Sequence, residues 1–233
     1  MNSQIQKPPT PWPLIVFFFV ILISSIFVGI FYYNYQKESL LSEKQQELSA
    51  ISDLKIRQIT QWRLERLADG KFLGDNFMMV EKFSEFLEDT IHMPDRDVIL
   101  QILKSLAENL DYRNTMLIDQ HGNVKLSSPN QDTLIGDHLQ PLLPKLIRNP
   151  KVELTDLHFT QVARVVHLDL VVPLIDRKLN DTLVLGFLVL QIDPQKVLYP
   201  LIQSWPTPSK SAETLLIRKD MLYERVKKKQ NSR

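Results

Sequence analysis

Hydrophobic and polar residues follow three patterns along the chain, and the first is an apolar run near the amino terminus. The stretch "LIVFFFVILISSIFVGIFYY" extends from Leu14 to Tyr33 without a charged residue. A helix of about 20 residues spans roughly 30 Å, which matches the hydrocarbon core of a bilayer. Trp12 before the run and Tyr35 after it suit the two membrane interfaces, where amphipathic rings lie. The pattern predicts a transmembrane segment over residues 14–35.

A cleaved signal peptide is the alternative interpretation of this run. The run is longer than a signal peptide needs, and no A-x-A-like cleavage site follows it. We therefore expect an uncleaved signal anchor. Lys7 lies before it and Lys37 and Lys44 lie after it, so the charges do not set its orientation. Because no second apolar run of comparable length follows, we expect all residues after Tyr35 to lie on one side of the membrane.

The second pattern is a helical spacing of apolar residues between polar ones, from Gln36 to about Ala68. This stretch contains no Pro or Gly. Five of its apolar residues fall on one stripe: Leu41, Leu48, Ile51, Ile59 and Trp62. We expect a helix of about 45–50 Å that emerges from the membrane and ends at Gly70 and Gly74. Half of the stripe is expected to pack on its own domain and half on a partner copy, with Leu48, Ile51 and Trp62 as dimer contacts.

Two shorter helices are predicted next. Residues 76–91, "NFMMVEKFSEFLEDTI", and residues 94–110, "PDRDVILQILKSLAENL", both repeat apolar residues at helical spacing. Pro94 occupies a first-turn position, where a missing amide hydrogen costs nothing. We interpret the Phe and Met residues of these helices as core rather than as a cofactor site.

The third pattern is an alternation typical of strands, which begins at residue 115. Residues 115–128 predict a hairpin whose turn, His121-Gly122-Asn123, tolerates left-handed backbone. A loop with a short helix is expected over residues 130–150. Three strand candidates and a short helix follow, over residues 152–159, 164–175, 182–193 and 194–205. This order predicts an antiparallel sheet packed against the long helix in an α+β domain.

The carboxyl-terminal stretch begins a new apolar segment and then stops. Pro206 and Pro208 close the preceding unit, and "ETLLIR" looks like the first strand of another. The chain then ends in the basic stretch "MLYERVKKKQNSR". We expect residues 206–233 to be a linker and the truncated start of a second unit. This segment is expected to be poorly ordered, because a lone strand leaves its backbone groups unpaired.

Composition narrows the range of functions. The chain has 233 residues, 44% hydrophobic and 24% charged, which suffices for one core of ordinary size with appendages. Its 28 basic and 27 acidic residues give a net charge of +1, which argues against a nucleic-acid binder. There is no cysteine, so disulfides, thiolate nucleophiles and cysteine metal ligands are excluded.

The layout of the chain resembles the Cache superfamily, the PAS-like extracytoplasmic sensor domains of bacterial receptors. The residues that carry the resemblance are 54–76, the hairpin "MLIDQHGNVKLSS" and residues 186–220. They are similar to the double-Cache sensor regions found ahead of histidine kinases and diguanylate cyclases. In that family a second sensing lobe, a second membrane helix and a cytoplasmic output domain would follow.

The resemblance implies an extracytoplasmic ligand-sensing domain over residues 36–205, anchored by a single pass in the bacterial inner membrane, with residues 1–13 in the cytoplasm. It implies a PAS-like sheet flanked by helices, no enzymatic activity, no cofactor and a small-molecule ligand of unknown identity. A homodimer or a mixed dimer with a full-length receptor is expected. We expect a truncated gene product or a gene fragment, with a stand-alone protein as the alternative. The alternative function is a membrane-anchored structural module that dimerises through its long helix.

Chemistry-bearing residues are few. No Cys–His pair, G-x-S-x-G, H-E-x-x-H or phosphate-binding Gly-rich loop occurs, which argues against catalysis. The histidines are dispersed, but His167 and Asp169 fall on one face of a predicted strand. Three interpretations stay open for this pair: a hydrogen bond within the fold, a contact to a sensed ligand, or part of a metal site. Since two ligands are fewer than Zn²⁺ takes, we predict no metal site.

Arg113 is the third candidate for ligand binding. It lies between a predicted helix and the first predicted strand, where its planar guanidinium could bind a carboxylate ligand. The alternative is a surface pair with Asp111 or with the helix carboxyl terminus. Amino-acid-binding double-Cache domains carry a spaced set of Tyr, Arg, Trp and Asp, which we do not find matched here. The sequence therefore leaves the ligand unnamed.

Overall fold

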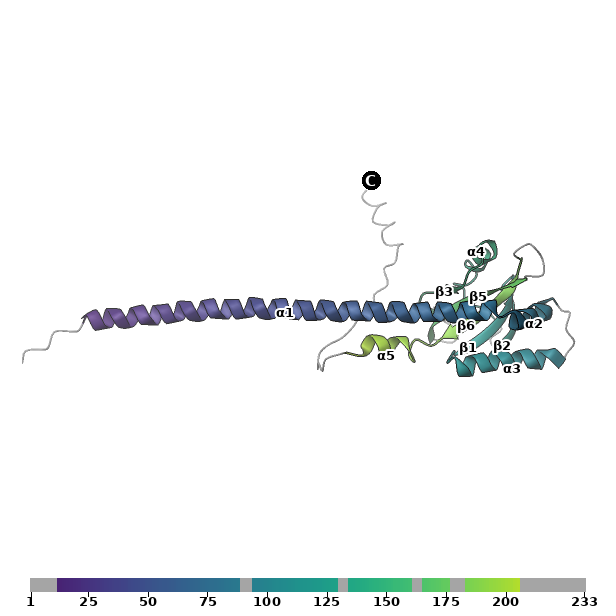
Figure 1. Ribbon diagram of the computed structural model, residues 1–233, viewed down its shortest axis with the longest axis horizontal. Coiled ribbons are helices and arrows are strands. Elements are labelled where there is room, and N and C mark those ends of the chain that lie inside the picture. Colours follow the sequence, from purple (N-terminus) through teal and green to yellow (C-terminus); the bar gives the residue numbers. More distant parts are fainter. Residues whose placement is uncertain (1–11, 89–93, 130–133, 161–164, 177–182, 206–233) are drawn as a thin grey trace, which may run out of the picture. The chain divides into compact units, whose positions relative to one another are not determined.

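The computed structural model describes residues 12–88, 94–129, 134–160, 165–176 and 183–205 (Figure 1). It divides the chain into two units, residues 1–54 and residues 55–233. The described helices are α1 (Trp12–Asp75), α2 (Phe77–Leu87), α3 (Pro94–Asn109), α4 (Leu143–Arg148) and α5 (Leu198–Gln203). The described strands are β1 (Asn114–Asp119), β2 (Val124–Ser128), β3 (Glu153–Leu154), β4 (His158–Thr160), β5 (Val165–Asp176) and β6 (Leu183–Ile192).

The described part of the first unit is the amino-terminal part of α1. Apolar side chains of the run predicted to cross the membrane are exposed along it, among them Phe17 (63%) and Phe31 (75%). Among the described residues there is one helix that is both long enough and apolar enough to span a bilayer, and it is α1. Apolar surface of this extent suits contact with lipid tails rather than with water. The finding is consistent with a single-pass membrane protein.

α1 continues to Asp75, past the two glycines that were expected to end it. Both glycines lie where the helix meets the sheet. A Cβ at Gly70 would lie 2.6 Å from Val152 Cγ1, and a Cβ at Gly74 would lie 3.0 Å from Val172 Cγ1. The predicted helix end is therefore correct to within one residue at Gly74, whereas Gly70 lies inside the helix, where its missing side chain serves close packing of helix on sheet.

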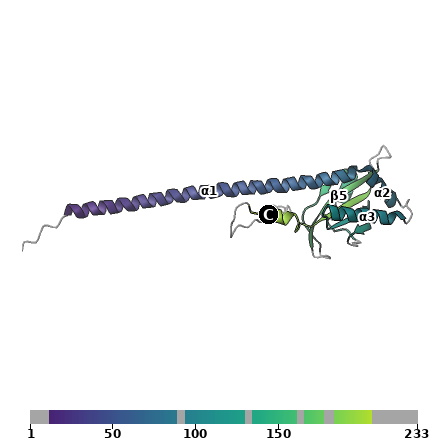
Figure 2. The ribbon, with the colours of Figure 1, turned by 60° about the horizontal axis from the view of Figure 1, so that its bottom comes forward.

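One antiparallel sheet forms the centre of the second unit. Its strand order is β2-β1-β6-β5-β3, and β4 pairs with β5 beside this path. Figure 2 shows α2 and α3 beside the sheet, and α2 contacts β5 while α3 contacts β1. The predicted hairpin is β1–β2, and Gly122 adopts φ +87° in its turn. The prediction of an α+β domain with an antiparallel sheet is confirmed.

The alternation of strand side chains fills two cores, one on each face of the sheet. The first core lies against α1, α2 and α3, which contribute Leu73, Phe83 and Leu103, and its strand residues include Leu117, Leu170 and Leu188. The second core lies under residues 135–147, and its members are Met116, Ile118, Leu139, Leu143, Leu146, Val171, Val184, Phe187 and Val189.

The residues predicted to form a dimer contact fall in both units. Trp62 belongs to the second unit and packs against the first core of its own domain. Leu48 and Ile51 belong to the first unit, and their role as dimer contacts stays a prediction. The orphan strand and basic tail predicted over residues 206–233 lie outside the described residues.

One predicted strand, over residues 152–159, is two strands in the structure. β3 pairs Leu154 with Leu170, whereas β4 pairs His158 with His167. Three residues, 155–157, therefore face two residues, 168 and 169, which is the register change of a β-bulge. The prediction of a single strand is wrong here, because an apolar–polar alternation does not reveal an inserted residue.

Candidate functional site

Asp169 lies in the middle of β5 on the face of the second core. Its neighbours Leu168 and Leu170 belong to the first core, so its own side chain points the opposite way, as Val171 does. Across the sheet, Asp169 is opposite Gln191 of β6, which is opposite Asn114 of β1. A row of polar residues therefore crosses an otherwise apolar face, and its Asp169 side chain is 1% exposed.

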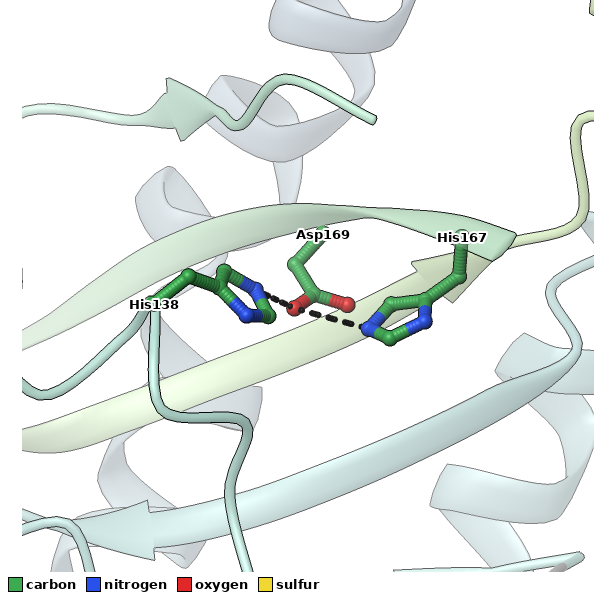
Figure 3. A group of neighbouring side chains, drawn as sticks. All are labelled: His138, His167 and Asp169. Carbon is green, nitrogen blue, oxygen red and sulfur yellow. Dashed lines mark hydrogen bonds and ion pairs between the residues drawn. The ribbon is translucent and has the colours of Figure 1, made fainter. Parts of the chain in front are cut away.

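Two histidines converge on the Asp169 carboxylate (Figure 3). His138 Nε2 lies 2.6 Å from Asp169 Oδ2, and His167 Nε2 lies 3.5 Å from the same oxygen. His167 comes from β5 itself, two residues away on the same face, whereas His138 comes from the segment that precedes α4. One ligand atom from each of the three side chains lies within 4.8 Å of the others.

A third imidazole supports this cluster. The ring of His158 stacks on the ring of His138, with centroids 3.7 Å apart and an interplanar angle of 13°. His158 is placed there by the pairing of β4 with β5, which sets it directly opposite His167. The stack fixes the plane of the His138 ring and with it the direction of Nε2 toward Asp169.

The β-bulge orients the carboxylate from the backbone side. The Asp169 amide donates to the Thr155 hydroxyl at 2.8 Å, and the Thr155 amide donates to the Asp169 carbonyl at 2.9 Å. A side-chain oxygen thus replaces the backbone carbonyl that a regular ladder would use. Since both backbone groups of Asp169 are held, its side chain has a defined position among the imidazoles.

The electrostatics of the cluster favour an ionised carboxylate. Burial raises the pKa of Asp169, but the hydrogen bonds and charges of His138 and His167 lower it by more, so the net pKa lies below the usual value. Among the described residues, the second carboxylate oxygen, Oδ1, is buried and accepts no hydrogen bond. A buried carboxylate oxygen without a donor is costly, which marks the Asp169 carboxylate as a position for a further ligand or ion.

A cavity of about 300 Å³ adjoins the cluster at His138. His138 and His158 line it on one side, together with Thr155 of the bulge. Its charged lining residues are Arg63, Lys145, Glu153 and Asp156, two of each sign. The Arg63 guanidinium donates from Nη2 to the Leu154 carbonyl at 3.2 Å, which joins α1 to β3 at the cavity wall. The cavity can therefore offer ion pairs to a small polar ligand.

The three predicted site residues have different surroundings. His167 and Asp169 come together, as expected for neighbours on one strand face. Arg113 precedes β1, and its amide donates to the Gln191 carbonyl at 2.8 Å. Its predicted alternative partner, Asp111, pairs instead with Lys196 at 2.6 Å. Arg113 is not part of the described cavity lining, and its role in ligand binding stays a prediction.

Sequence reasoning missed His138 and His158. His158 carried a usable signal, because "LHF" and "VHLDL" are consecutive strand candidates whose antiparallel pairing sets two histidines opposite each other. His138 carried none, since it lies in a loop between elements. The expectation of no metal site rested on two ligands, and the fold supplies a third.

Comparison with known proteins supports the fold. No protein-family profile matches the sequence, and no curated protein matches it either. The structure is similar to the sensor domain of the V. cholerae histidine kinase DctB, with a TM-score of 0.52 and 18% identity over 74% of this chain and 61% of that one. It is also similar to the extracellular domain of vpHK1S-Z8, a protein described as a histidine kinase. The TM-score is 0.51 and the identity 14%, over 67% of this chain and 60% of that one. The resemblance to extracytoplasmic sensor domains is thus confirmed at the level of the fold, and the chain spans about three fifths of these relatives.

Proposed function

We propose that this chain is the membrane-anchored, extracytoplasmic ligand-sensing region of a bacterial signal-transduction receptor of the sensor histidine kinase or diguanylate cyclase type. The observation that carries the proposal is the cavity of about 300 Å³ beside the second core, lined by charges of both signs. Its volume lies at the lower end of the range for small-molecule sites, about 300–1,000 Å³. The likeness to histidine kinase sensor domains supports the same assignment.

The cavity is built so that a ligand contacts the long helix directly. Arg63 is a residue of α1, whereas Glu153 lies on β3 and Lys145 on α4. A ligand that carries both an anionic and a cationic group would pair with Arg63 and Glu153 at once. Such a ligand favours the arrangement of the domain in which the helix and the sheet edge both contact it. The ligand shifts the equilibrium toward this arrangement because it binds there more tightly than to an arrangement that lacks one of the contacts.

The remaining expectations follow from this assignment. The apolar run of α1 serves as a single-pass anchor in the inner membrane, and the domain lies outside the cytoplasm. We infer no enzymatic role, since the similar structures are sensor domains rather than catalytic ones. Output activity would reside elsewhere in a receptor.

A thermal-shift screen tests the proposal. The full chain in detergent is melted against a panel of amino acids, carboxylates and amines, and a ligand that binds the folded state raises the melting temperature by mass action. Arg63→Gln should abolish the shift, while Arg57→Gln, an exposed position on the same helix, should leave it unchanged. If every compound in the panel leaves the melting temperature unchanged, or if both variants respond like the parent, the cavity is not the sensing site.

Self-association through α1 is the second candidate function. The specific observation is that Leu41 and Leu48, seven residues apart, are 53% and 56% exposed. Residues at this spacing lie on one helix face, as in the seam of a coiled coil. This role is compatible with sensing, because neither Leu41 nor Leu48 belongs to the described cavity lining.

A further inference from the structure

We propose that His138, His167 and Asp169 form a binding site for one divalent transition-metal ion, with Zn²⁺ as the best match. Binding of the ion goes beyond the proposed sensing function and does not depend on it. A role of the ion as the sensed ligand, by contrast, would rest on the proposed sensing function.

The number and type of the ligands fit Zn²⁺. Two imidazole nitrogens and one carboxylate oxygen make a set that this ion accepts in three-ligand sites, which leave a fourth position open. Ligand atoms around a tetrahedral Zn²⁺ lie roughly 3.3 Å apart, given bonds of about 2.0 Å. The three atoms here lie within 4.8 Å of one another, with Asp169 Oδ2 at 2.6 Å and 3.5 Å from the two nitrogens. Small side-chain rotations therefore suffice to admit the ion.

Burial provides an independent argument. Asp169 is 1% exposed and its Oδ1 accepts no hydrogen bond among the described residues. An anionic group in such a place is stabilised by a cation bound beside it. The two histidines supply a compensating positive charge only when they are protonated. A metal ion supplies a fixed positive charge, and the imidazole nitrogens coordinate it with their lone pairs.

The surroundings supply the supports that metal ligands usually have. Thr155 holds the Asp169 backbone at 2.8 Å, and the stacked His158 ring fixes the plane of His138. Such contacts set the orientation of metal ligands and raise affinity. The route of entry is also present, because His138 lines the cavity and is the most exposed of the three side chains, at 14%. The open fourth position would face this cavity and take a water molecule or a ligand group.

The ligand set also excludes some ions. Mg²⁺ and Ca²⁺ prefer sites made of oxygen atoms, whereas imidazole favours Zn²⁺, Cu²⁺ and Ni²⁺. The site should therefore discriminate against Mg²⁺ and Ca²⁺. This preference separates a coordination site from a general attraction of cations to a buried carboxylate.

Direct metal titration tests the proposal. The full chain in detergent is stripped with a chelator and titrated with Zn²⁺ alone in a calorimeter. We expect one ion per chain, with affinity lowered at least about 100-fold in His138→Ala and His167→Ala. His121→Ala, in the exposed turn of the β1–β2 hairpin, is the matched control and should bind like the parent. Absence of saturable binding, or equal binding by His138→Ala and the parent, would overturn the site.

A second measurement uses the unmodified chain and so does not depend on whether a variant folds. Co²⁺ added to the unmodified chain should give the intense visible absorption of a four-coordinate ion, and Zn²⁺ should displace it while Mg²⁺ and Ca²⁺ do not. A weak octahedral spectrum, or displacement by Ca²⁺ at similar concentration, contradicts the proposed coordination. Failure of these titrations removes the metal site and leaves the small-molecule screen of the sensing function unaffected. The reverse outcome, metal binding with no response to any small molecule, removes only the cavity as a sensing site.

Discussion

The carboxylate of Asp119 closes the turn between β1 and β2. It accepts hydrogen bonds from the His121 amide at 2.9 Å, the Asn123 amide at 2.9 Å and the Asn123 side-chain amide at 2.8 Å. Lys125 lies 3.5 Å from it. Partial burial raises the pKa of Asp119, but these hydrogen bonds and the Lys125 charge lower it by more, so the folded-state pKa lies below the usual value.

We predict that Asp119→Ala lowers the free energy of unfolding by about 1–2 kcal/mol at neutral pH, since three hydrogen bonds are lost. Because the pKa is lower in the folded state, the ionised carboxylate stabilises the fold above the unfolded-state pKa of about 3.9, and this contribution disappears as the pH falls through the folded-state pKa. The stability difference between the variant and the parent should therefore shrink below about pH 4. Urea unfolding at neutral and acidic pH measures it.

Gln120→Ala, an exposed change in the same turn, is the control for this experiment. It should cost little at either pH. A deficit in Asp119→Ala that is equally large in acid would show that the turn is held by side-chain packing rather than by the charged carboxylate.

The residues of the candidate site show what sequence reasoning at this scale can reach. His167 and Asp169 were found because strand alternation puts them on one face, and the structure agrees. His138 was not, since its 2.6 Å contact with Asp169 joins residues 31 positions apart. Local patterns carry no information about a contact that only the closure of a loop over the sheet creates.

At the scale of elements, Gly186 lies at a close contact of β6 with β1 and α2. It lies on β6, opposite Asp119 of β1 and Leu174 of β5. A Cβ at this position would collide with the backbone oxygen of Ile118 and would lie 2.6 Å from Leu87 Cδ1 of α2. The backbone oxygen cannot move without breaking the β1–β6 ladder, so the site has no inexpensive way to relax.

We predict that Gly186→Ala lowers the free energy of unfolding by about 2–3 kcal/mol, toward the upper end of the usual cost of overpacking. Denaturant unfolding of the two proteins measures the change. Leu183→Ala, at a 45% exposed position of the same strand, should cost less than about 1 kcal/mol. Equal stability of Gly186→Ala and the parent would mean that β1 and β6 are less closely paired than described.

The elements themselves were largely predictable. Helical spacing identified α2 and α3 to within a few residues, and alternation with turn residues identified the β1–β2 hairpin and the long strands β5 and β6. The errors have a common cause. Gly70 was interpreted by its backbone freedom, although its function is to make room for Val152, and the bulge at Thr155 depends on a hydroxyl that competes for the Asp169 amide.

At the scale of the whole molecule, the orientation of the chain in the membrane is a prediction that a reporter can test. Alkaline phosphatase fused after Arg233 should be active, because we place the carboxyl-terminal domain outside the cytoplasm. The same enzyme fused after Lys7 should be inactive. Strong activity of a cytoplasm-only reporter at Arg233 would reverse the proposed topology.

Pairing of α1 between two copies is open to a clean experiment, because the chain has no cysteine. Leu48→Cys introduces a single thiol on the exposed apolar stripe, and Gln46→Cys introduces one on the opposite helix face as the control. If the stripe forms a dimer seam, oxidation in membranes should cross-link Leu48→Cys several-fold faster than Gln46→Cys. Equal rates would indicate random collision.

If the domain senses a ligand as proposed, the position of β5 determines how far a signal has to pass within it. Asp169 faces the histidine cluster, while its neighbour Leu170 faces α1, where its Cδ2 would lie 3.2 Å from a Cβ at Gly70. Because Gly70 has no side chain, the Leu170 side chain packs directly against the helix backbone at this point. The residue that faces the histidine cluster and the residue that faces the helix are one step apart along the strand, a rise of about 3.3 Å. A displacement of β5 therefore cannot stay local: the helix has to follow it, or the contact has to break.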